Sequence, residues 1–392
     1  MNDHTGTGWR RYAERLVDGL VRRGALHDHR WGDALLAVPR HHFVPAHYTR
    51  SGRGGPWRRH DPGAEPDAPG WLRQAYSDAA LTIALSELDM WGDRRPVAAS
   101  PPPELTVRGL QALGVQDGDR LLHLGVGSGH TTALAAHRLS GDQVVGVEID
   151  PDLLRAAVQR LRARDVRATV VAGDGGMPVT LLGDGAAFDR VLVGYESDEV
   201  PAAWVRHVRP GGRLLARLAG GLGGGGHVLL ERPTTDPRAA SAEPPRLVGR
   251  FLGWTGHSRH DGSRRAGAPS GLADDDSPLV LLAQLHLPPG TTRAARSTGT
   301  ATATYLQARD GSWAEITHAP DRGGRHDTRE AGQTRLVHAL DQAAAVFDDL
   351  GHPEWADFGV TATASGTHVW HRDPETGPRW PLGTTWAANT GT

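Results

Sequence analysis

The sequence contains no cysteine and no lysine. The absence of cysteine excludes disulfides, thiolate nucleophiles and zinc sites built on thiolates. The 43 basic residues are all arginine, and 45 acidic residues balance them to a formal net charge of −2. We interpret the arginine usage as the codon bias of a GC-rich genome. This balanced charge gives no indication of a nucleic-acid or other polyanionic partner.

Long apolar runs are also missing, because no stretch approaches the roughly 18–20 residues that a membrane-spanning helix needs. The first residues, Met1 to His4, are polar and do not resemble the apolar part of a signal peptide. We therefore expect a cytoplasmic protein that is not inserted in a membrane. At about 100–200 residues per domain, 392 residues predict two or three domains.

The first part of the chain is predicted to be helical. Tyr12, Leu16 and Leu20 recur every fourth residue within a helix over 8–23, and Gly24 is placed to end it. A second short helix is expected over 31–38, before Pro39. The polar stretch 51–70 is rich in glycine, proline and arginine, which is typical of a flexible loop or an insertion.

From residue 117 onward, strand-like runs alternate with helix-like ones. Asp150 is a good N-cap for one of these helices, and Pro151 suits its first position. The predicted strands are 120–124, 143–149, 169–172, 190–193 and 213–217, and a further helix is predicted over 131–139. This alternation indicates an α/β domain with a mostly parallel sheet covered on both faces.

The rhythm changes after a stretch rich in proline, threonine, alanine and serine, which we interpret as a linker at 233–245. Beyond it, strand-like runs flank one predicted helix near 333–350. Those runs are 279–287, 303–307, 360–363 and 368–371. We expect a separate C-terminal α+β domain over 246–392.

The most informative segment is a Gly-x-Gly-x-Gly turn at 125–129, which follows one predicted strand and opens a helix. Glycines let a backbone turn sharply and approach a ligand closely. Glu148 ends the next strand, where its carboxylate could accept hydrogen bonds from both ribose hydroxyls of a nucleoside. A dinucleotide fingerprint would need its third glycine at position 130, which is histidine, and no Walker Gly-Lys-Ser/Thr follows. The spacing favours a nucleoside that carries an amino-acid tail, and the alternative is a glycine-rich turn without a ligand.

A second pointer to the same ligand is Gly173-Asp174-Gly175, which follows the third predicted strand. A carboxylate at that strand end could accept from the exocyclic amine of adenine, although such a tripeptide alone is more often a turn. Together these segments give the predicted cofactor-binding residues: Gly125, Val126, Gly127, Ser128, Gly129, Glu148, Ile149, Asp174 and Gly175.

Residues 10–232 resemble the S-adenosylmethionine-dependent methyltransferases, specifically the protein-L-isoaspartate O-methyltransferase family. The resemblance rests on five ordered matches. They are Val38-Pro39-Arg40-His41-His42-Phe43-Val44-Pro45; Ala75-Tyr76-Ser77-Asp78 with Leu81 and Ile83; Ser100-Pro101-Pro102; Phe188-Asp189-Arg190-Val191 with Val200-Pro201; and Arg209-Pro210-Gly211-Gly212-Arg213-Leu214. The resemblance implies a Rossmann-like core at 117–232 behind an N-terminal helical segment at 1–116. It also implies S-adenosyl-L-methionine as the cofactor and a carboxylate as the methyl acceptor.

The resemblance further implies two catalytic residues. Ser100 would orient the substrate carboxylate through its hydroxyl, and Asp78 would shape the same pocket. A carboxylate has a pKa near 4, so it is ionised at pH 7 and attacks the methyl group without a strong general base. Catalysis would then depend mostly on positioning and electrostatics.

Several positions depart from the family pattern. His123 replaces an acidic residue, His130 an aromatic one and His227 a glutamine, and Pro103-Glu104-Leu105-Thr106 replaces an apolar run. Histidines also cluster around the 38–45 motif, but we interpret them as packing residues and assign no metal.

The C-terminal region resembles the extension of relatives that act with peptide-modification systems in actinobacteria, near ATP-grasp ligases or lanthipeptide synthetases. The matching stretches are Asp357-Phe358-Gly359-Val360-Thr361, Gly366-Thr367-His368-Val369-Trp370 and Trp380-Pro381-Leu382. This resemblance implies methyl esterification of an Asp side chain in a ribosomally made peptide, such as a graspetide or lanthipeptide, and then aspartimide or isoaspartate. The alternatives are a repair enzyme for isoaspartyl residues of damaged proteins and a non-catalytic scaffold that binds a peptide.

Overall fold

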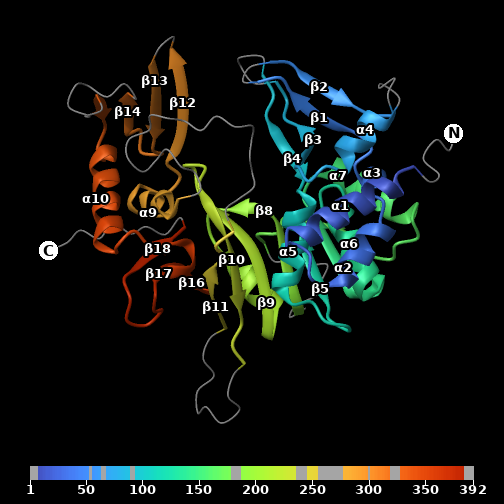
Figure 1. The fold of residues 1–392 in the computed structure, drawn as a ribbon. Coiled ribbons are helices and arrows are strands. Elements are labelled where there is room, and N and C mark those ends of the chain that lie inside the picture. Colours follow the sequence, from blue (N-terminus) through green and yellow to red (C-terminus); the bar gives the residue numbers. More distant parts are fainter. Residues whose placement is uncertain are drawn as a thin grey trace. The chain divides into compact units, whose positions relative to one another are not determined.

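A computed structural model describes residues 8–52, 55–62, 68–88, 93–177, 187–234, 245–254, 277–298, 301–317 and 327–383. The chain forms two compact units, Met1–Gly194 and Tyr195–Thr392 (Figure 1). Most of the linker predicted at 233–245 lies outside the described residues. The division into domains 1–232 and 246–392 therefore stays a prediction.

The first unit combines helices with two sheets. Its elements are α1 (Arg10–Arg22), α2 (His29–Ala37), α3 (Arg40–Phe43), β1 (His47–Arg50), β2 (Trp57–His60), α4 (Ala68–Ala75), β3 (Leu81–Leu85), β4 (Pro96–Ser100), α5 (Pro103–Leu113), β5 (Leu121–Leu124), α6 (His130–Leu139), β6 (Val144–Glu148), α7 (Pro151–Arg162), β7 (Thr169–Ala172) and β8 (Phe188–Ser197).

The predicted first helix is confirmed as α1. Leu20 is fully buried, and Gly24 follows the helix in the left-handed region at φ 67°, where an L-residue would be strained. The amide of Ala25 donates to the carbonyl of Leu20 over 2.9 Å, which closes a Schellman-type end. This end turns the chain sharply into α2.

The predicted parallel sheet is confirmed, with strand order β8-β5-β6-β7 within this unit. All four residues of β5 are buried because helices cover both faces of a parallel strand. Asp150 caps α7 as predicted, since its carboxylate accepts from the amides of Asp152 and Leu153. The carboxyl ends of β5, β6 and β7 therefore meet at one edge of the sheet.

The segment 51–70 was predicted to be a flexible loop or an insertion, and the loop alternative is wrong for its described part. Trp57–His60 form β2, which pairs with β1 so that His60 lies opposite His47. The four strands of this second sheet follow the order β2-β1-β3-β4. A four-residue strand has little periodicity of its own, and the glycines and prolines around β2 indicate a loop. The sequence pattern therefore did not predict this strand.

The second unit is mainly antiparallel. Its elements are α8 (Ala202–His207), β9 (Val208–Ala219), β10 (Gly225–Glu231), β11 (Arg246–Phe251), α9 (Pro278–His286), β12 (Thr292–Thr298), β13 (Ala301–Gln307), β14 (Trp313–Thr317), β15 (Thr328–Ala331), α10 (Leu336–Asp349), β16 (Phe358–Thr363), β17 (Gly366–His371) and β18 (Arg379–Leu382). One sheet has the order β18-β17-β16-β11-β10-β9, and the other has β12-β13-β14-β15.

The strand predicted at 279–287 is wrong, because this segment is the helix α9. The Ser277 hydroxyl accepts from the amide of Leu279 over 3.2 Å, and Pro278 occupies the first turn. Six of the nine helical residues are buried, so the run is apolar almost all round. A short apolar run does not distinguish a buried helix from a buried strand, and the serine–proline start was the deciding signal.

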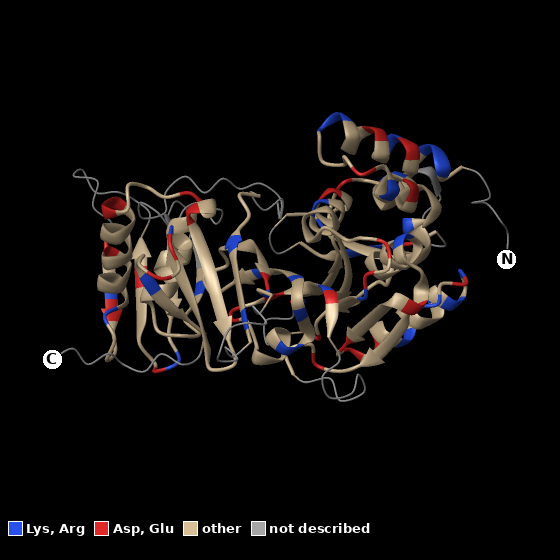
Figure 2. Cartoon of the chain, turned by 90° about the horizontal axis from the view of Figure 1, so that it is seen from below, with Lys and Arg blue, Asp and Glu red and all other residues tan. Residues whose placement is uncertain are grey.

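Charged residues of both signs are interspersed along both units (Figure 2). Among the described residues, no helix has both the length and the apolar character that crossing a bilayer requires.

Candidate functional site

The glycine loop joins β5 to α6 at the carboxyl edge of the parallel sheet. Gly125, Gly127 and Gly129 all have positive φ angles, of 82°, 54° and 87°. This backbone favours glycine at each of the three positions, as the Gly-x-Gly-x-Gly pattern predicts. A Cβ at Gly129 would lie 3.4 Å from the Cβ of Ala157 and 3.5 Å from a ring carbon of Phe43. A side chain at position 129 would therefore press against Ala157 and Phe43, so glycine suits this position.

Glu148 lies where the sequence predicts, at the end of β6 beside the loop. Its side chain is 5% exposed, and both carboxylate oxygens accept backbone hydrogen bonds. Oε2 accepts from the amide of Gly127 over 2.7 Å, and Oε1 accepts from the amide of Asp150 over 3.0 Å. Each oxygen has a second lone pair. The carboxylate can therefore hold the loop and still accept from a pair of vicinal hydroxyls.

The two apolar residues of the predicted cofactor set differ in exposure. Val126 is buried, and its methyl group would lie 2.5 Å from a Cβ at Gly146, so it packs on β6. Val126 can therefore offer a ligand only its backbone. Ile149 follows Glu148 and is 69% exposed, although it is a large apolar residue. An apolar side chain beside an acidic hydrogen-bond acceptor suits a flat base attached to a ribose.

The remaining predicted cofactor residues line the same edge. The Ser128 hydroxyl accepts from the amide of His130 over 3.2 Å, which fixes the start of α6. Asp174 is exposed after β7, and its Oδ1 accepts from the amide of Gly176 over 2.8 Å. Asp174 thus forms a turn while keeping its other oxygen for a ligand, and Gly175 beside it is buried.

Ser100 ends β4 and is 2% exposed. It lies opposite Leu81 in the β3–β4 hairpin, whose register is interrupted at Ile83. The Cδ1 of Ile83 lies 3.8 Å from the position that a Cβ on Gly127 would take. The hairpin that carries Ser100 therefore lies near the glycine loop. Among the described residues, no group makes a hydrogen bond to the Ser100 hydroxyl.

Both carboxylate oxygens of Asp78 have partners within the protein. Oδ2 pairs with the Arg23 guanidinium at 2.6 Å, and Oδ1 accepts from the amide of Glu104 at 2.9 Å. The second contact satisfies an amide in the first turn of α5. Asp78 thus ties its segment to the end of α1 and to the start of α5.

The histidines that depart from the family pattern are buried and neutral. Burial lowers the pKa of His123 to about 4, and its Nδ1 lies 2.8 Å from the Thr132 hydroxyl. Burial and the Arg40 charge lower the pKa of His130 to about 3. In the second unit, burial and the Arg217 charge lower the pKa of His227 to about 4. None of the three can serve as a charged group at pH 7.

These pKa values predict that the protein loses stability in mild acid. The folded pKa of His123 lies below the unfolded value of about 6.5. The unfolded chain therefore binds the proton first as the pH falls through 6.5 towards 4, and full stability is present only above about pH 6.5. At pH 5, His123 alone should reduce the free energy of unfolding by about 2 kcal/mol. Urea unfolding at pH 7.5 and pH 5 measures this loss.

The His123→Asn variant isolates this contribution. Its stability should fall about 2 kcal/mol less than that of the unchanged protein between the two pH values. His29→Asn is the control, because His29 is exposed. Equal losses in the unchanged protein and in His123→Asn would contradict the assignment.

Three residues with site contacts were not predicted. Ile83 reaches the glycine loop, and Gly194 approaches it so closely that a Cβ would lie 2.6 Å from the Gly125 carbonyl. Arg40 is 2% exposed and reaches the carbonyl of Pro101, next to Ser100. Ile83 and Arg40 both stand in motifs that match the family, and this match could have indicated them as site residues. No sequence pattern indicated Gly194.

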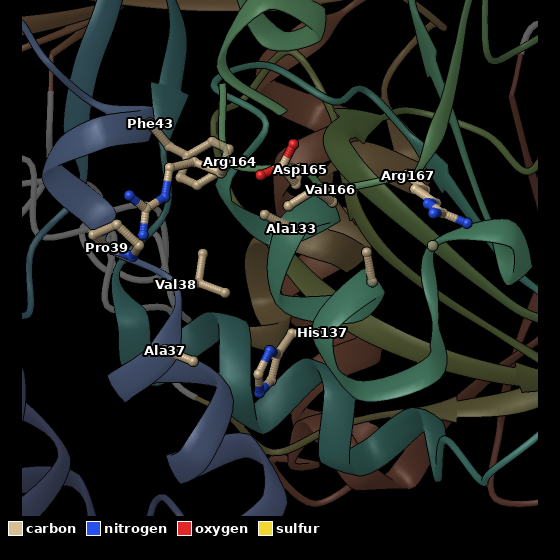
Figure 3. A pocket seen from close by; sticks show the side chains of 12 residues that line it. Ala37, Val38, Pro39, Phe43, Ala133, His137, Arg164, Asp165, Val166 and Arg167 are labelled. Atoms are coloured by element: carbon tan, nitrogen blue, oxygen red, sulfur yellow. The ribbon is translucent and has the colours of Figure 1, made fainter. Parts of the chain in front are cut away.

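A separate cavity of about 370 Å³ lies where α2 and α6 approach the segment 164–167 (Figure 3). Val38, Phe43 and Ala133 give it an apolar wall, and Arg164 lies beside it. Its lining residues 141 and 166–167 precede β6 and β7, whereas Phe43 and Ala133, which also line it, lie near Gly129. None of the predicted site residues lines it. Among the described residues, no group of three or more His, Asp or Glu side chains could hold a metal ion.

The family model described as "Protein-L-isoaspartate(D-aspartate) O-methyltransferase (PCMT)" matches residues 68–220. The chain is 31% identical over 227 residues to the protein-L-isoaspartate O-methyltransferase of Aeropyrum pernix, covering 54% of this chain and 72% of that protein. It is also 31% identical over 208 residues to the namesake protein of Roseiflexus castenholzii, covering 52% of this chain and 76% of that protein.

Among solved structures, one named protein-L-isoaspartate O-methyltransferase is 18% identical. It covers 91% of this chain and 98% of its own, with a TM-score of 0.46.

Proposed function

Because the chain belongs to the protein-L-isoaspartate O-methyltransferase family, we propose that it methylates the free carboxylate of isoaspartyl residues in proteins or peptides. The enzyme class is that of the S-adenosyl-L-methionine-dependent carboxyl O-methyltransferases. The glycine loop, Glu148 and Ile149 fit this cofactor, since they offer a narrow backbone cradle, a buried hydroxyl acceptor and an exposed apolar surface. From the sequence alone, this function was the alternative to a peptide-modifying enzyme.

The observation that carries the proposal is the unsatisfied Ser100 hydroxyl. A buried hydroxyl without a partner costs roughly 1–3 kcal/mol, so its retention needs an explanation. A substrate carboxylate beside the glycine loop would supply the missing acceptor. Ile83 of the same hairpin lies near Gly127, so the hairpin borders the loop.

In this proposal the glycine loop and Glu148 bind the methyl donor, and Ser100 orients the methyl acceptor. S-adenosyl-L-methionine supplies a methyl group on a positively charged sulfur. The Ser100 hydroxyl donates to one oxygen of the substrate carboxylate and leaves the other oxygen to attack. The new C–O bond forms as the C–S bond breaks, so a methyl ester and a neutral thioether result and no proton moves. This balance explains why the site needs no acid–base pair.

A second candidate for the methyl acceptor is an Asp side chain of a ribosomally made peptide. The replacement of the family's apolar run by Pro103-Glu104-Leu105-Thr106 and the chain beyond the family match favour it. Esterification would be followed by attack of the neighbouring backbone nitrogen, with loss of methanol, to give aspartimide. That product could hydrolyse to isoaspartate.

Two synthetic peptides of one sequence test these candidates. One carries isoaspartate at a single position and the other carries aspartate. With S-adenosyl-L-methionine, mass spectrometry should show the mass of one added methylene on the isoaspartyl peptide only. Methylation of the aspartyl peptide, followed by net loss of one water, would favour the second candidate. A protein that does not bind S-adenosyl-L-methionine in calorimetry would instead be a non-catalytic scaffold.

A further inference from the structure

Arg40 gathers four backbone carbonyls around one buried side chain. Nη1 donates to the carbonyls of Ala75 and Ser77 over 3.1 and 2.8 Å. Nη2 donates to the carbonyls of Ala79 and Pro101 over 3.0 and 2.9 Å. Three stretches that stand apart in the sequence, at 38–45, 75–79 and 100–102, therefore meet at a single guanidinium.

The guanidinium keeps its charge in this position. Burial lowers the pKa of Arg40 to about 10, while the negative charge of Asp78 raises it, so the group stays protonated at pH 7. Burying a charge is costly unless its hydrogen bonds are satisfied. Four carbonyl oxygens do this for the two Nη atoms. A planar fork with fixed donor directions sets the distances among these carbonyls more strictly than an ammonium group could.

The Ser100 hydroxyl, by contrast, is placed by its backbone alone. It makes no hydrogen bond within the described part of the chain. The place of its Cβ therefore depends on the backbone torsions of Ser100, and the rotation about χ1 then directs the hydroxyl. Two constraints act on those torsions. One is the Pro101 ring, which restricts the residue before it, and the other is the hydrogen bond from Arg40 to the Pro101 carbonyl.

We infer that Arg40 is a positioning residue for methyl transfer: it fixes the 100–102 segment against the 75–79 segment, so that the Ser100 hydroxyl is already aimed when the substrate carboxylate arrives. The inference rests on the proposed function, because it concerns the carboxylate site. Arg40 acts through the backbone beside Ser100. Misplacing a reacting group by about 1 Å can cost roughly 100-fold in rate.

A double-mutant cycle in the full chain separates positioning from a general role in folding. We would measure kcat and KM for the isoaspartyl peptide in the unchanged protein, Arg40→Lys, Ser100→Ala and the double variant. Arg40→Lys keeps the charge but cannot reach four carbonyls. It should lower kcat by about tenfold when Ser100 is present and by less than about twofold when Ser100 is alanine. Equal losses in both backgrounds would overturn the inference.

Arg190→Lys is the matched control. Its guanidinium likewise donates to backbone carbonyls, since Nε and Nη2 bind that of Gly114 over 3.2 and 3.0 Å and Nη1 binds that of Asp189 over 2.9 Å. Nε also pairs with Asp119 at 3.1 Å. Arg190 begins the pairing of β8 with β5 at the edge opposite the glycine loop. This substitution should change kcat by less than about twofold, because additivity holds for distant sites.

If Arg40→Lys does not fold, Arg40→Gln provides the second test, because it buries no charge and its amide keeps two N–H donors for the carbonyls. It should also lower kcat by about tenfold when Ser100 is present and by less than about twofold when Ser100 is alanine. Equal losses in both backgrounds would overturn the inference. The proposed function fails separately, if the unchanged protein binds S-adenosyl-L-methionine but methylates neither peptide.

Discussion

Ser100→Ala is expected to lower kcat for methyl transfer by about 10- to 100-fold, because it removes a hydrogen bond to a charged group. The hydroxyl is buried and has no hydrogen-bond partner in the described structure, so its removal leaves no protein group unsatisfied. Because the unpartnered hydroxyl costs roughly 1–3 kcal/mol, the variant should be at least as stable as the unchanged protein. Its dissociation constant for S-adenosyl-L-methionine should also be unchanged. Initial rates with the isoaspartyl peptide and calorimetry with the cofactor measure the two quantities separately.

Ser86→Ala is the matched control for this loss. Ser86 lies just beyond β3, at the other end of the same hairpin. Its hydroxyl donates to the carbonyl of Glu87 over 2.7 Å and accepts from the amide of Arg95 over 3.0 Å. Losing these bonds should reduce stability by about 1 kcal/mol without affecting kcat. If both serine variants kept full activity, Ser100 would have no part in orienting the carboxylate.

The cofactor half of the site was predictable because its geometry is local. Strands β5 and β6 are parallel neighbours, so the residues that follow them meet at one edge. The glycine spacing then specifies a turn with positive φ, and the acid at position 148 lies beside it. Each step uses only residues close in sequence and the regular geometry of a parallel sheet. The same logic placed Asp174 at the end of β7.

The carboxylate half could be predicted only by resemblance. Arg40 bonds to carbonyls that lie 35 to 61 positions away along the chain. Backbone carbonyls have no residue-type signature, so no periodicity or composition indicates such contacts. Ile83 is similar, because it meets the glycine loop where the β3–β4 register is interrupted. An irregularity of this kind redirects a side chain and is not visible as an alternating pattern.

These two halves depend on one another through the hairpin. Ser100 can act only if the segment that carries it stays beside the glycine loop, and Ile83 on the opposite strand lies near that loop. Arg40 fixes the hairpin to the 75–79 segment, and Asp78 at the end of that segment pairs with Arg23 and holds the start of α5. We therefore interpret the family motifs as parts of one support for a single hydroxyl.

Glu148→Ala should raise the dissociation constant for S-adenosyl-L-methionine by about 100-fold, as measured by calorimetry, because hydrogen bonds to a charged group contribute roughly 1.5–3 kcal/mol each. The variant loses the acceptor for the nucleoside hydroxyls. It also frees the amide of Gly127, which now donates to Oε2 over 2.7 Å. A loop with three positive φ angles then has less to hold it in the binding conformation.

Glu148→Gln separates the two effects. The amide side chain keeps one accepting oxygen but turns an NH2 group towards the amide of either Gly127 or Asp150, so one backbone contact becomes repulsive. We expect a smaller increase in the dissociation constant, of about tenfold. Asp28→Ala is the control, since it removes the cap of α2 at a cost of about 1 kcal/mol and should leave cofactor affinity unchanged. If Glu148→Ala bound the cofactor as tightly as the unchanged protein, the nucleoside would not lie at the end of β6, and the assignment of the glycine loop would be wrong.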